Sequence, residues 1–352
     1  MKKLLMVVCV CLAALTMVSS AFAVELWDWH LRGSNEGLAS GALPPPGLYF
    51  INDFYWTGNW KLYNNGGHVA TFAGTNVTEA KLSAYVDVPI LLWNPGLCPI
   101  LGAKYAAAIA QPFDGTTLRL DPDNVFINDS VTGTVDGTQW GAYQTVLVPF
   151  ILSWEIPCNL HVAASFAVGL NDGTTSPGDS YASITKLYKD RLTSKDQRNV
   201  YAWSASNNYT FTPTLGVSWL YGGWNISAGF QYTFWTKDDD CEIQNGDQLA
   251  MDYTLTYTCG KWTFGLGAEG EQQLFNDKGY YLPTGSVFPV YGKLNNTMAV
   301  NWTAGPIIGY DFGPCSLLFT YNFEILTKND VGGDWAMLRL VVPLGDPCNW
   351  YR

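Results

Sequence analysis

The stretch Gln248–Thr258, QLAMDYTLTYT, alternates strictly between two kinds of side chain. One face carries the apolar residues Leu249, Met251, Tyr253, Leu255 and Tyr257, and the other carries Ala250, Asp252, Thr254, Thr256 and Thr258. Because successive side chains of a β-strand point to opposite faces, a period of two predicts a strand. This strand has one apolar side and one side suited to water or to polar partners.

The same pattern returns at 225–234 and 294–312, so the predicted strands are long. Strands of ordinary globular proteins run about five or six residues. The polar faces hold Thr, Asn, Ser and Gly rather than Lys and Glu, which suits a wet interior behind an apolar outer band. Tyr and Trp gather near strand ends, as at Trp219, Tyr221 and Trp224, where membrane barrels carry aromatic girdles.

The connections between strands alternate in length. Short turns fall at 94–102, 157–159, 221–224, 259–261 and 313–315, with longer polar stretches at 60–79, 112–140, 171–198, 237–246, 275–291 and 328–333. Outer-membrane barrels have short periplasmic turns and longer extracellular loops. We therefore predict an all-β fold, a transmembrane antiparallel up-and-down β-barrel of about twelve strands over residues 47–344. The strands are expected at 47–59, 80–93, 103–111, 141–156, 160–170, 199–220, 225–236, 247–258, 262–274, 292–312, 316–327 and 334–344.

Residues 1–23 have the features of a cleaved signal peptide. Lys2 and Lys3 precede an apolar run, Leu4–Ala14, and Ala21-Phe22-Ala23 supplies the small residues of a cleavage site. An uncleaved membrane helix is the alternative, but the run is short for a span of about 20 residues. Export together with the strand pattern predicts a location in the bacterial outer membrane.

Composition narrows the functional classes. Only 14% of the residues are charged and 15% are aromatic, whereas about a quarter of a soluble domain is charged. Without the two lysines of the leader, 17 basic and 30 acidic residues give a net charge of −13, which does not suit a nucleic-acid partner. Residues 24–46 are expected to form either a periplasmic N-terminal segment or a plug folded into the barrel. Residues 345–352 are expected to be a C-terminal tail.

Two groups of motifs resemble a known family. The stretch Leu43–Asn52 reads LPPPGLYFIN and leads into aromatic residues. Toward the end stand Gly305-Pro306, Gly309-Tyr310, Tyr321, Glu324, Lys328-Asn329, Gly333-Asp334, Leu338-Arg339-Leu340 and Pro343-Leu344. Over residues 43–344 the chain is similar to outer-membrane proteins of the MetA-pathway phenol-degradation family. The resemblance implies a barrel that takes up hydrophobic or aromatic compounds, and it supplies no catalytic residues. One departure is that the chain runs on to Arg352 instead of ending on an aromatic residue that the assembly machinery reads.

The pattern and the resemblance together predict an outer-membrane channel for passive uptake of small, hydrophobic or aromatic solutes, with no enzyme activity and no cofactor. Its expected partners are outer-membrane lipids and lipopolysaccharide, the solute and the barrel-assembly machinery. One alternative is an outer-membrane enzyme of the lipid-hydrolase type, which a hydrogen-bonded Ser–His pair would favour. Another is a closed structural or adhesive barrel without a pore. The sequence leaves the oligomeric state open.

Strand parity places ionisable side chains toward the lumen, and the candidate lumen-lining or selectivity residues are Lys81, Asp87, Lys104, His161, Asp252, Glu269, Glu271, Asp311, Glu324 and Arg339. They form either a constriction whose field selects solutes or a network of ion pairs that braces a narrow barrel. Acidic members outnumber basic ones, so such a field would favour cations. His161 shares a strand face with Ser165, but four residues at about 3.3 Å each are too long for a catalytic hydrogen bond.

Six cysteines follow the leader, and four of them, Cys98, Cys158, Cys259 and Cys315, fall in short turns. Cys98 and Cys158 lie in neighbouring turns, as do Cys259 and Cys315, so two disulfides are candidates in an oxidising compartment. Free thiols without a role are the alternative. The sequence has no CxxC motif and no Cys–His cluster, so no metal site is predicted.

Overall fold

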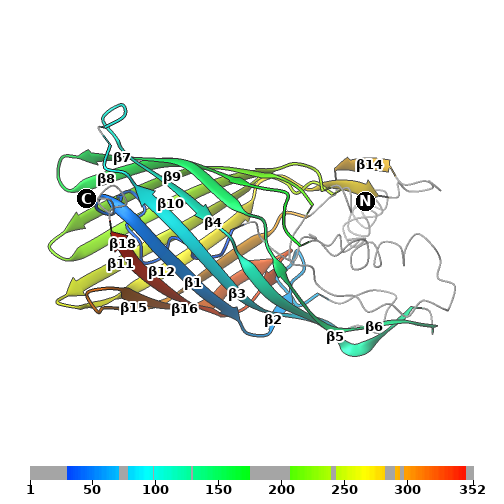
Figure 1. The fold of residues 1–352 in the computed structure, drawn as a ribbon. Coiled ribbons are helices and arrows are strands. Elements are labelled where there is room, and N and C mark those ends of the chain that lie inside the picture. The colour runs from blue at the N-terminus through cyan, green and yellow to red at the C-terminus, as the bar shows by residue number, and fades with distance from the viewer. Residues whose placement is uncertain are drawn as a thin grey trace, which may run out of the picture.

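The computed structural model describes residues 30–70, 78–97, 99–127, 130–174, 207–238, 243–281, 290–293 and 297–345. Strands, turns and irregular segments make up this part of the chain (Figure 1). No helix in it is long and apolar enough to cross a membrane. The expected signal peptide and all but the first residue of the expected C-terminal tail lie outside the described residues.

Twelve long antiparallel strands close into a barrel. In chain order they are β1 (Gly47–Thr57), β3 (Glu79–Asn94), β4 (Lys104–Ala110), β7 (Val146–Ile156), β8 (Leu160–Gly169), β9 (Thr210–Tyr221), β10 (Trp224–Trp235), β11 (Gln248–Cys259), β12 (Trp262–Gln273), β15 (Val300–Asp311), β16 (Ser316–Lys328) and β18 (Trp335–Gly345). β1 pairs with β3 on one side and with β18 on the other, which joins the first strand to the last. The predicted fold class and strand count are confirmed.

Accessory strands belong to the end of the barrel that carries the long loops: β2 (Trp60–Leu62), β5 (Phe113–Ile127), β6 (Ser130–Ala142), β13 (Lys278–Tyr281), β14 (Val290–Lys293) and β17 (Val331–Gly332). The β5–β6 hairpin extends beyond the barrel, and β5 continues along β3 where β4 ends (Figure 1). This corrects the loop predicted at 112–140. The stretch is rich in Gly, Thr and Asp, so its strands have no apolar face from which alternation could be recognised.

The outer surface of the barrel is apolar between two aromatic rims. On β11, Leu255 and Tyr257 are 43% and 40% exposed, whereas the alternate residues Asp252 and Thr254 are only 2% and 4% exposed. A stacked row near the loops comprises Phe150, Phe166, Phe211 and Phe234, and ring contacts near the turns join Trp219 to Tyr221, Trp224 to Tyr257 and Trp262 to Tyr310. A closed barrel in a bilayer needs an apolar outer surface of this kind. A soluble protein made of two sheets packed on a dry core would bury its apolar side chains instead.

The N-terminal segment, residues 30–46, runs inside the barrel from the loop end to the turn end. At the loop end, Arg32 donates a hydrogen bond to Asp330. At the turn end, the side-chain amide of Asn94 donates to the carbonyl oxygen of Pro44. The described part of this segment therefore fills a portion of the lumen, as a plug does, and does not hang below the barrel.

Candidate functional site

One half of the interior is polar and packs against the N-terminal segment. Its inward side chains are buried hydroxyl, amide and carboxyl groups, including Thr212, Ser218, Ser227, Glu269, Glu271, Asn301, Thr303 and Asn322. The backbone and side-chain amides of Asn35 donate to Oδ2 of Asp252 at 3.1 and 3.0 Å. The backbone amide of Gly37 donates to Oγ1 of Thr254 at 2.9 Å. Such contacts offset the cost of taking these polar groups out of water.

Arg339 on β18 joins three parts of the molecule. Its Nε and Nη2 atoms donate to the two carboxylate oxygens of Asp53 on β1 at 2.6 and 2.7 Å. Its Nη1 and Nη2 atoms also donate to the backbone carbonyls of Glu36 and Ser34 at 3.1 and 2.5 Å. Both ionic side chains are 2% exposed, so this bidentate pair is shielded from salt and water. It ties the first strand, the last strand and the N-terminal segment together.

Arg32 holds the loop end of the N-terminal segment. Its guanidinium lies 2.7 Å from Asp330 and 3.3 Å from Glu271, and it donates to the carbonyl of Val331 at 2.9 Å. The same group lies over the ring of Trp60, 4.7 Å from its centroid. A cation over an aromatic face is stabilised by the ring's negative charge density. The charges of Arg32 are therefore matched at the mouth of the barrel.

Glu36 is the fully buried acid of the N-terminal segment. Its Oε1 accepts a hydrogen bond from the amide of Asn322 at 2.7 Å. Burial, reinforced by the nearby charge of Asp252, raises the pKa of Glu36 to about 9, so the side chain is protonated at neutral pH. On β12, Gly267 makes room for it, because a Cβ at that position would overlap Oε2 of Glu36.

The other half of the interior is an apolar cavity of about 350 Å³. It lies between the N-terminal segment and the inner faces of β1, β3, β4, β7 and β8, and its apolar lining includes Leu31, Leu38, Ile51, Val86, Val88, Ile90, Val146, Val148 and Ile151. Polar residues also reach the cavity: Ser165, Thr214 and Gln231 follow one another in register across β8, β9 and β10. The charged side chains that line it include Arg32, Asp53, Asp114 and Arg339. The lumen is thus divided lengthwise into a filled polar half and an apolar half that contains free space.

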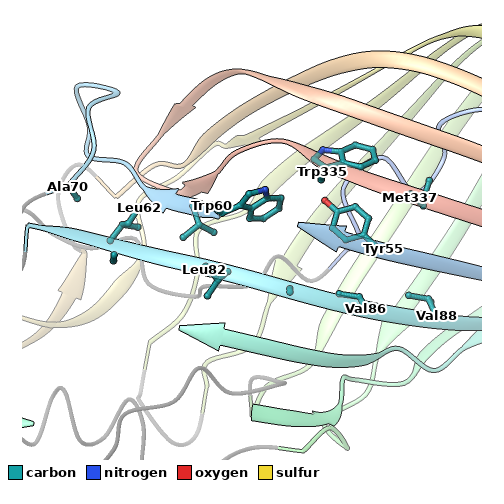
Figure 2. Close-up of a cluster of buried hydrophobic side chains, with 12 residues drawn as sticks. Tyr55, Trp60, Leu62, Ala70, Leu82, Val86, Val88, Trp335 and Met337 are labelled. Carbon is teal, nitrogen blue, oxygen red and sulfur yellow. The ribbon is translucent and has the colours of Figure 1, made fainter. Parts of the chain in front are cut away.

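A cluster of buried apolar side chains continues the cavity wall toward the loop end (Figure 2). Tyr55 on β1 and Trp335 on β18 have ring centroids 5.1 Å apart. Trp60 on β2 faces them, and Leu82 on β3, which pairs with Trp60 in register, lies next to it (Figure 2). All four side chains are at most 2% exposed, so the loop end of the apolar half is densely packed.

Four of the predicted lumen residues lie in the polar half. Asp252, Glu269, Glu271 and Arg339 are each at most 2% exposed and face inward, as strand parity predicts. Asp252, Glu271 and Arg339 contact the N-terminal segment, and Glu269 accepts a hydrogen bond from Thr303 on the neighbouring strand. None of them faces open water. These contacts are of the kind that a bracing network requires, and the role of the four residues stays a prediction.

Four others lie at the ends of the barrel. At the turn end, Lys104 pairs with Glu155, the carboxylate that lies across from His161 in register. Also at the turn end, Asp311 is exposed and accepts a hydrogen bond from the amide of Gly313. At the loop end, Glu324 accepts a hydrogen bond from the hydroxyl of Tyr63 at 2.9 Å.

The placement of Lys81 and Asp87 in the lumen is wrong. Asp87 pairs in register with Phe54, which is 50% exposed on the outer face, and it accepts a hydrogen bond from Asn52 at 2.6 Å. Lys81 lies on the same outer face of β3, in an ion pair with Glu79 at 2.9 Å. The prediction assumed that the polar side of every strand faces the lumen, whereas β3 turns its apolar side inward to line the cavity.

The predicted disulfide between Cys259 and Cys315 is also wrong, because both thiols are free. β12 and β15 lie between β11, which ends at Cys259, and β16, which follows Cys315. Strands are spaced about 4.8 Å apart, so this separation exceeds the Cα distance that a disulfide can bridge. Cys158 is free as well, and Cys98 lies outside the described residues.

His161 has no catalytic surroundings in the described part of the chain. It pairs in register with Ser218 on β9, but the hydroxyl of Ser218 accepts hydrogen bonds from the Gly41 amide and from Ser227. A hydrolase of the predicted alternative type requires a hydrogen bond between a histidine and a serine. Among these residues no such bond joins His161 to a serine. Among the same residues, no three His, Cys, Asp or Glu side chains are arranged to hold a metal ion.

The structure was compared with solved structures of other proteins, and the matches include outer-membrane proteins. An outer membrane channel from Pseudomonas putida F1 matches at 12% identity with a TM-score of 0.61, covering 86% of this chain and 97% of that one. The translocator domain of the autotransporter NalP from Neisseria meningitidis matches at 8% identity and a TM-score of 0.43, covering 86% and 90%. The toluene transporter TbuX from Ralstonia pickettii matches at 11% identity and a TM-score of 0.40, covering 85% and 90%. No curated protein matches the sequence.

One family model matches the sequence over residues 63–340. This span begins before β3 and extends into β18, so it contains almost the whole barrel. It also agrees with the resemblance that the motifs of the two ends suggest. The chain therefore belongs to the family described as "Putative MetA-pathway of phenol degradation".

Proposed function

We propose that this protein is a passive channel of the outer membrane that admits small apolar solutes, aromatic compounds among them. The observation that carries the proposal is the cavity, because most of its lining is apolar, as at Val86, Val88 and Ile90. Arg32, Asp53, Asp114 and Arg339 also reach it, but Arg32 and Arg339 are paired with carboxylates. A hydrated ion gains nothing from the apolar side chains, since they offer no groups to replace its water. An apolar solute loses its unfavourable contact with water there.

The size of the cavity supports small aromatic solutes in particular. A dry apolar cavity of about 150 Å³ accepts benzene. A cavity of about 350 Å³ therefore has room for one or two fused rings. The family description, which names phenol degradation, points to the same class of compound.

The fold supports a channel in the outer membrane. The chain shares its barrel with the Pseudomonas putida protein, whose name describes an outer membrane channel. The apolar outer face and the two aromatic rims suit that location. We propose no catalytic reaction for this protein, because His161 has no hydrogen-bonded serine among the described residues.

The test measures uptake of labelled phenol by cells that carry the protein and by cells that lack it. Val88→Trp fills the cavity from β3, and uptake is expected to fall to that of cells lacking the protein. Leu91→Trp is the matched control, because Leu91 is 44% exposed on the outer face of the same strand. Both variants are checked for folding by heat-modifiable gel mobility. Equal uptake by Val88→Trp and the parent protein would overturn the proposal.

A further inference from the structure

We infer that the N-terminal segment is a permanent wall of the solute path, and that Leu31 and Leu38 are specificity-determining side chains on that wall. The claim of permanence rests on contacts of the segment alone. The role of the two leucines rests on the proposed function. A plug that swings out to open the pore is the competing arrangement.

The N-terminal segment has two chemically different sides. Its polar groups face β9–β12 and β18, where Asn35 and Gly37 bond to Asp252 and Thr254. Its apolar side chains face the other way: Leu31 packs against the cluster that contains Tyr55, and Leu38 lines the cavity. Leu31 and Leu38 therefore add apolar surface to the cavity opposite β3, beside the polar residues His30, Arg32, Ser34 and Asn35, which also line it.

The wall behind the N-terminal segment is shaped to its backbone. A Cβ at Gly216 on β9 would overlap the carbonyl of Ser40, and one at Gly41 would overlap the carbonyl of His161. Glycine is the residue that permits such close approach of one backbone to another. A segment that left its place in each transport cycle would have to break and remake this close fit each time.

Displacement of the segment would also break hydrogen bonds to charged side chains of the barrel wall. Arg339 would keep Asp53 but lose the carbonyls of Ser34 and Glu36. Asp252 would lose both donors of Asn35. These hydrogen bonds to charged groups, typically worth about 1.5–3 kcal/mol each, would have to be exchanged for water in every transport cycle. The closed arrangement is thus the one that the polar half is built to hold.

A disulfide can test permanence directly. A Cβ added at Gly229 on β10 would lie 3.6 Å from Cβ of Ser40. Disulfides bridge Cβ atoms about 3.5–4.5 Å apart. Gly229→Cys with Ser40→Cys, in a background whose other cysteines are replaced by serine, is therefore expected to form a bond that fixes the segment to β10. Its formation is measured by mass spectrometry of the linked peptides, with each single variant as a control.

Uptake of labelled phenol is then compared between the oxidised and the reduced double variant. We expect equal uptake in the two states. Loss of uptake on oxidation and recovery on reduction would show that the segment must move, and would overturn the inference while leaving the channel intact. Failure of the disulfide to form would overturn it too, because Ser40 would not rest beside Gly229. If the parent protein itself takes up no phenol, it is the proposed function that fails.

The role of the leucines has its own readout, the ratio of 1-naphthol uptake to phenol uptake. Leu38→Ala widens the path and is expected to raise this ratio severalfold, whereas Leu38→Trp is expected to lower it severalfold. Leu91→Ala, on the outer face of β3, is the matched control and leaves the ratio unchanged. A ratio that stays the same in both Leu38 variants would remove Leu38 from the path.

Discussion

Asn52 and Asp87 form a polar pair on the outer face of the barrel, among apolar side chains. In register with Asp87 lie Phe54 on β1 and Phe113 on β5, which are 50% and 46% exposed. A carboxylate in such a place is unfavourable in a membrane, although less so than a basic side chain. Its hydrogen bond with Asn52, at 2.6 Å, offsets part of that cost.

This pair leads to a prediction about stability. Asn52→Leu removes the hydrogen-bond donor and leaves the carboxylate of Asp87 unpaired. This should lower the free energy of unfolding by about 1–3 kcal/mol. The double variant Asn52→Leu with Asp87→Leu removes both polar groups and should be as stable as the parent protein or more so. Urea unfolding in lipid vesicles, followed by tryptophan fluorescence, measures both. Additive losses in the double variant would contradict the pairing.

Glu36 leads to a prediction about pH. Its pKa is raised to about 9 by burial, so the folded protein keeps this proton over a range in which the unfolded chain releases it. Stability contributed by the protonated side chain is therefore complete at low pH and is lost progressively as pH rises from about 4.5 toward 9. Glu36→Gln keeps an acceptor for Asn322 and should remove this slope. Parallel stability curves for the two proteins between pH 5 and about 9 would contradict the assignment.

At the scale of single elements, the strands were easier to predict than the direction in which they face. β11 was predicted with both bounds within one residue and with the correct lipid-facing row, because its polar side faces the lumen as in an ordinary barrel. On β3 the bounds were equally close, but both of its sides carry apolar residues, and the more uniform row from Ala80 to Val88 faces inward. Nothing local to β3 distinguishes the apolar wall of a cavity from the apolar wall of a barrel.

The N-terminal segment could not be predicted as a site because its partners are far away in sequence. Arg32 is 298 residues from Asp330, and Asn35 is 217 residues from Asp252. One indication was present in the sequence: inward positions of neighbouring strands carry glycine at Gly216, Gly229 and Gly267. Glycine on the lumen side marks a place where another backbone approaches closely.

Gly267 on β12 supports a prediction at this scale. Gly267→Ala introduces a methyl group where Oε2 of Glu36 lies, so the carboxyl must move or the strand must shift. Overpacking of this kind typically costs about 1–3 kcal/mol. In a Glu36→Ala background the same substitution should cost clearly less, because the space is vacant. Urea unfolding of the parent protein, the two single variants and the double variant gives the coupling free energy between positions 36 and 267. If Gly267→Ala lowers the free energy of unfolding equally in both backgrounds, the two side chains are not in contact.

For the molecule as a whole, the division of the lumen determines what can flow. The polar half is filled by the N-terminal segment, and the lining of the apolar half consists mainly of hydrocarbon side chains, which are poor ligands for ions. Similar twelve-stranded barrels are narrow, nearer to filled barrels than to the wide porins. The protein should therefore pass little ionic current while it admits neutral solutes.

Planar-bilayer recordings test this statement. The parent protein should show a small conductance with little preference for cations, because Asp252, Glu269 and Glu271 are covered. Deletion of residues 30–42 uncovers the polar half and should raise the conductance severalfold and make it cation-selective. The folded fraction of the deletion variant is measured by heat-modifiable mobility, so that only inserted protein is counted. Unchanged conductance in correctly folded deletion protein would be inconsistent with a filled polar half.

The contacts of Arg339 also bear on how the barrel is assembled. This one side chain on the final strand binds Asp53 on the opening strand and two carbonyl groups of the chain that lies within. The bonds to Asp53 form when the seam between β1 and β18 closes, and the bonds to the two carbonyls form when the N-terminal segment lies inside. We therefore expect insertion of the segment and closure of the barrel to favour each other, because both supply partners to the same guanidinium.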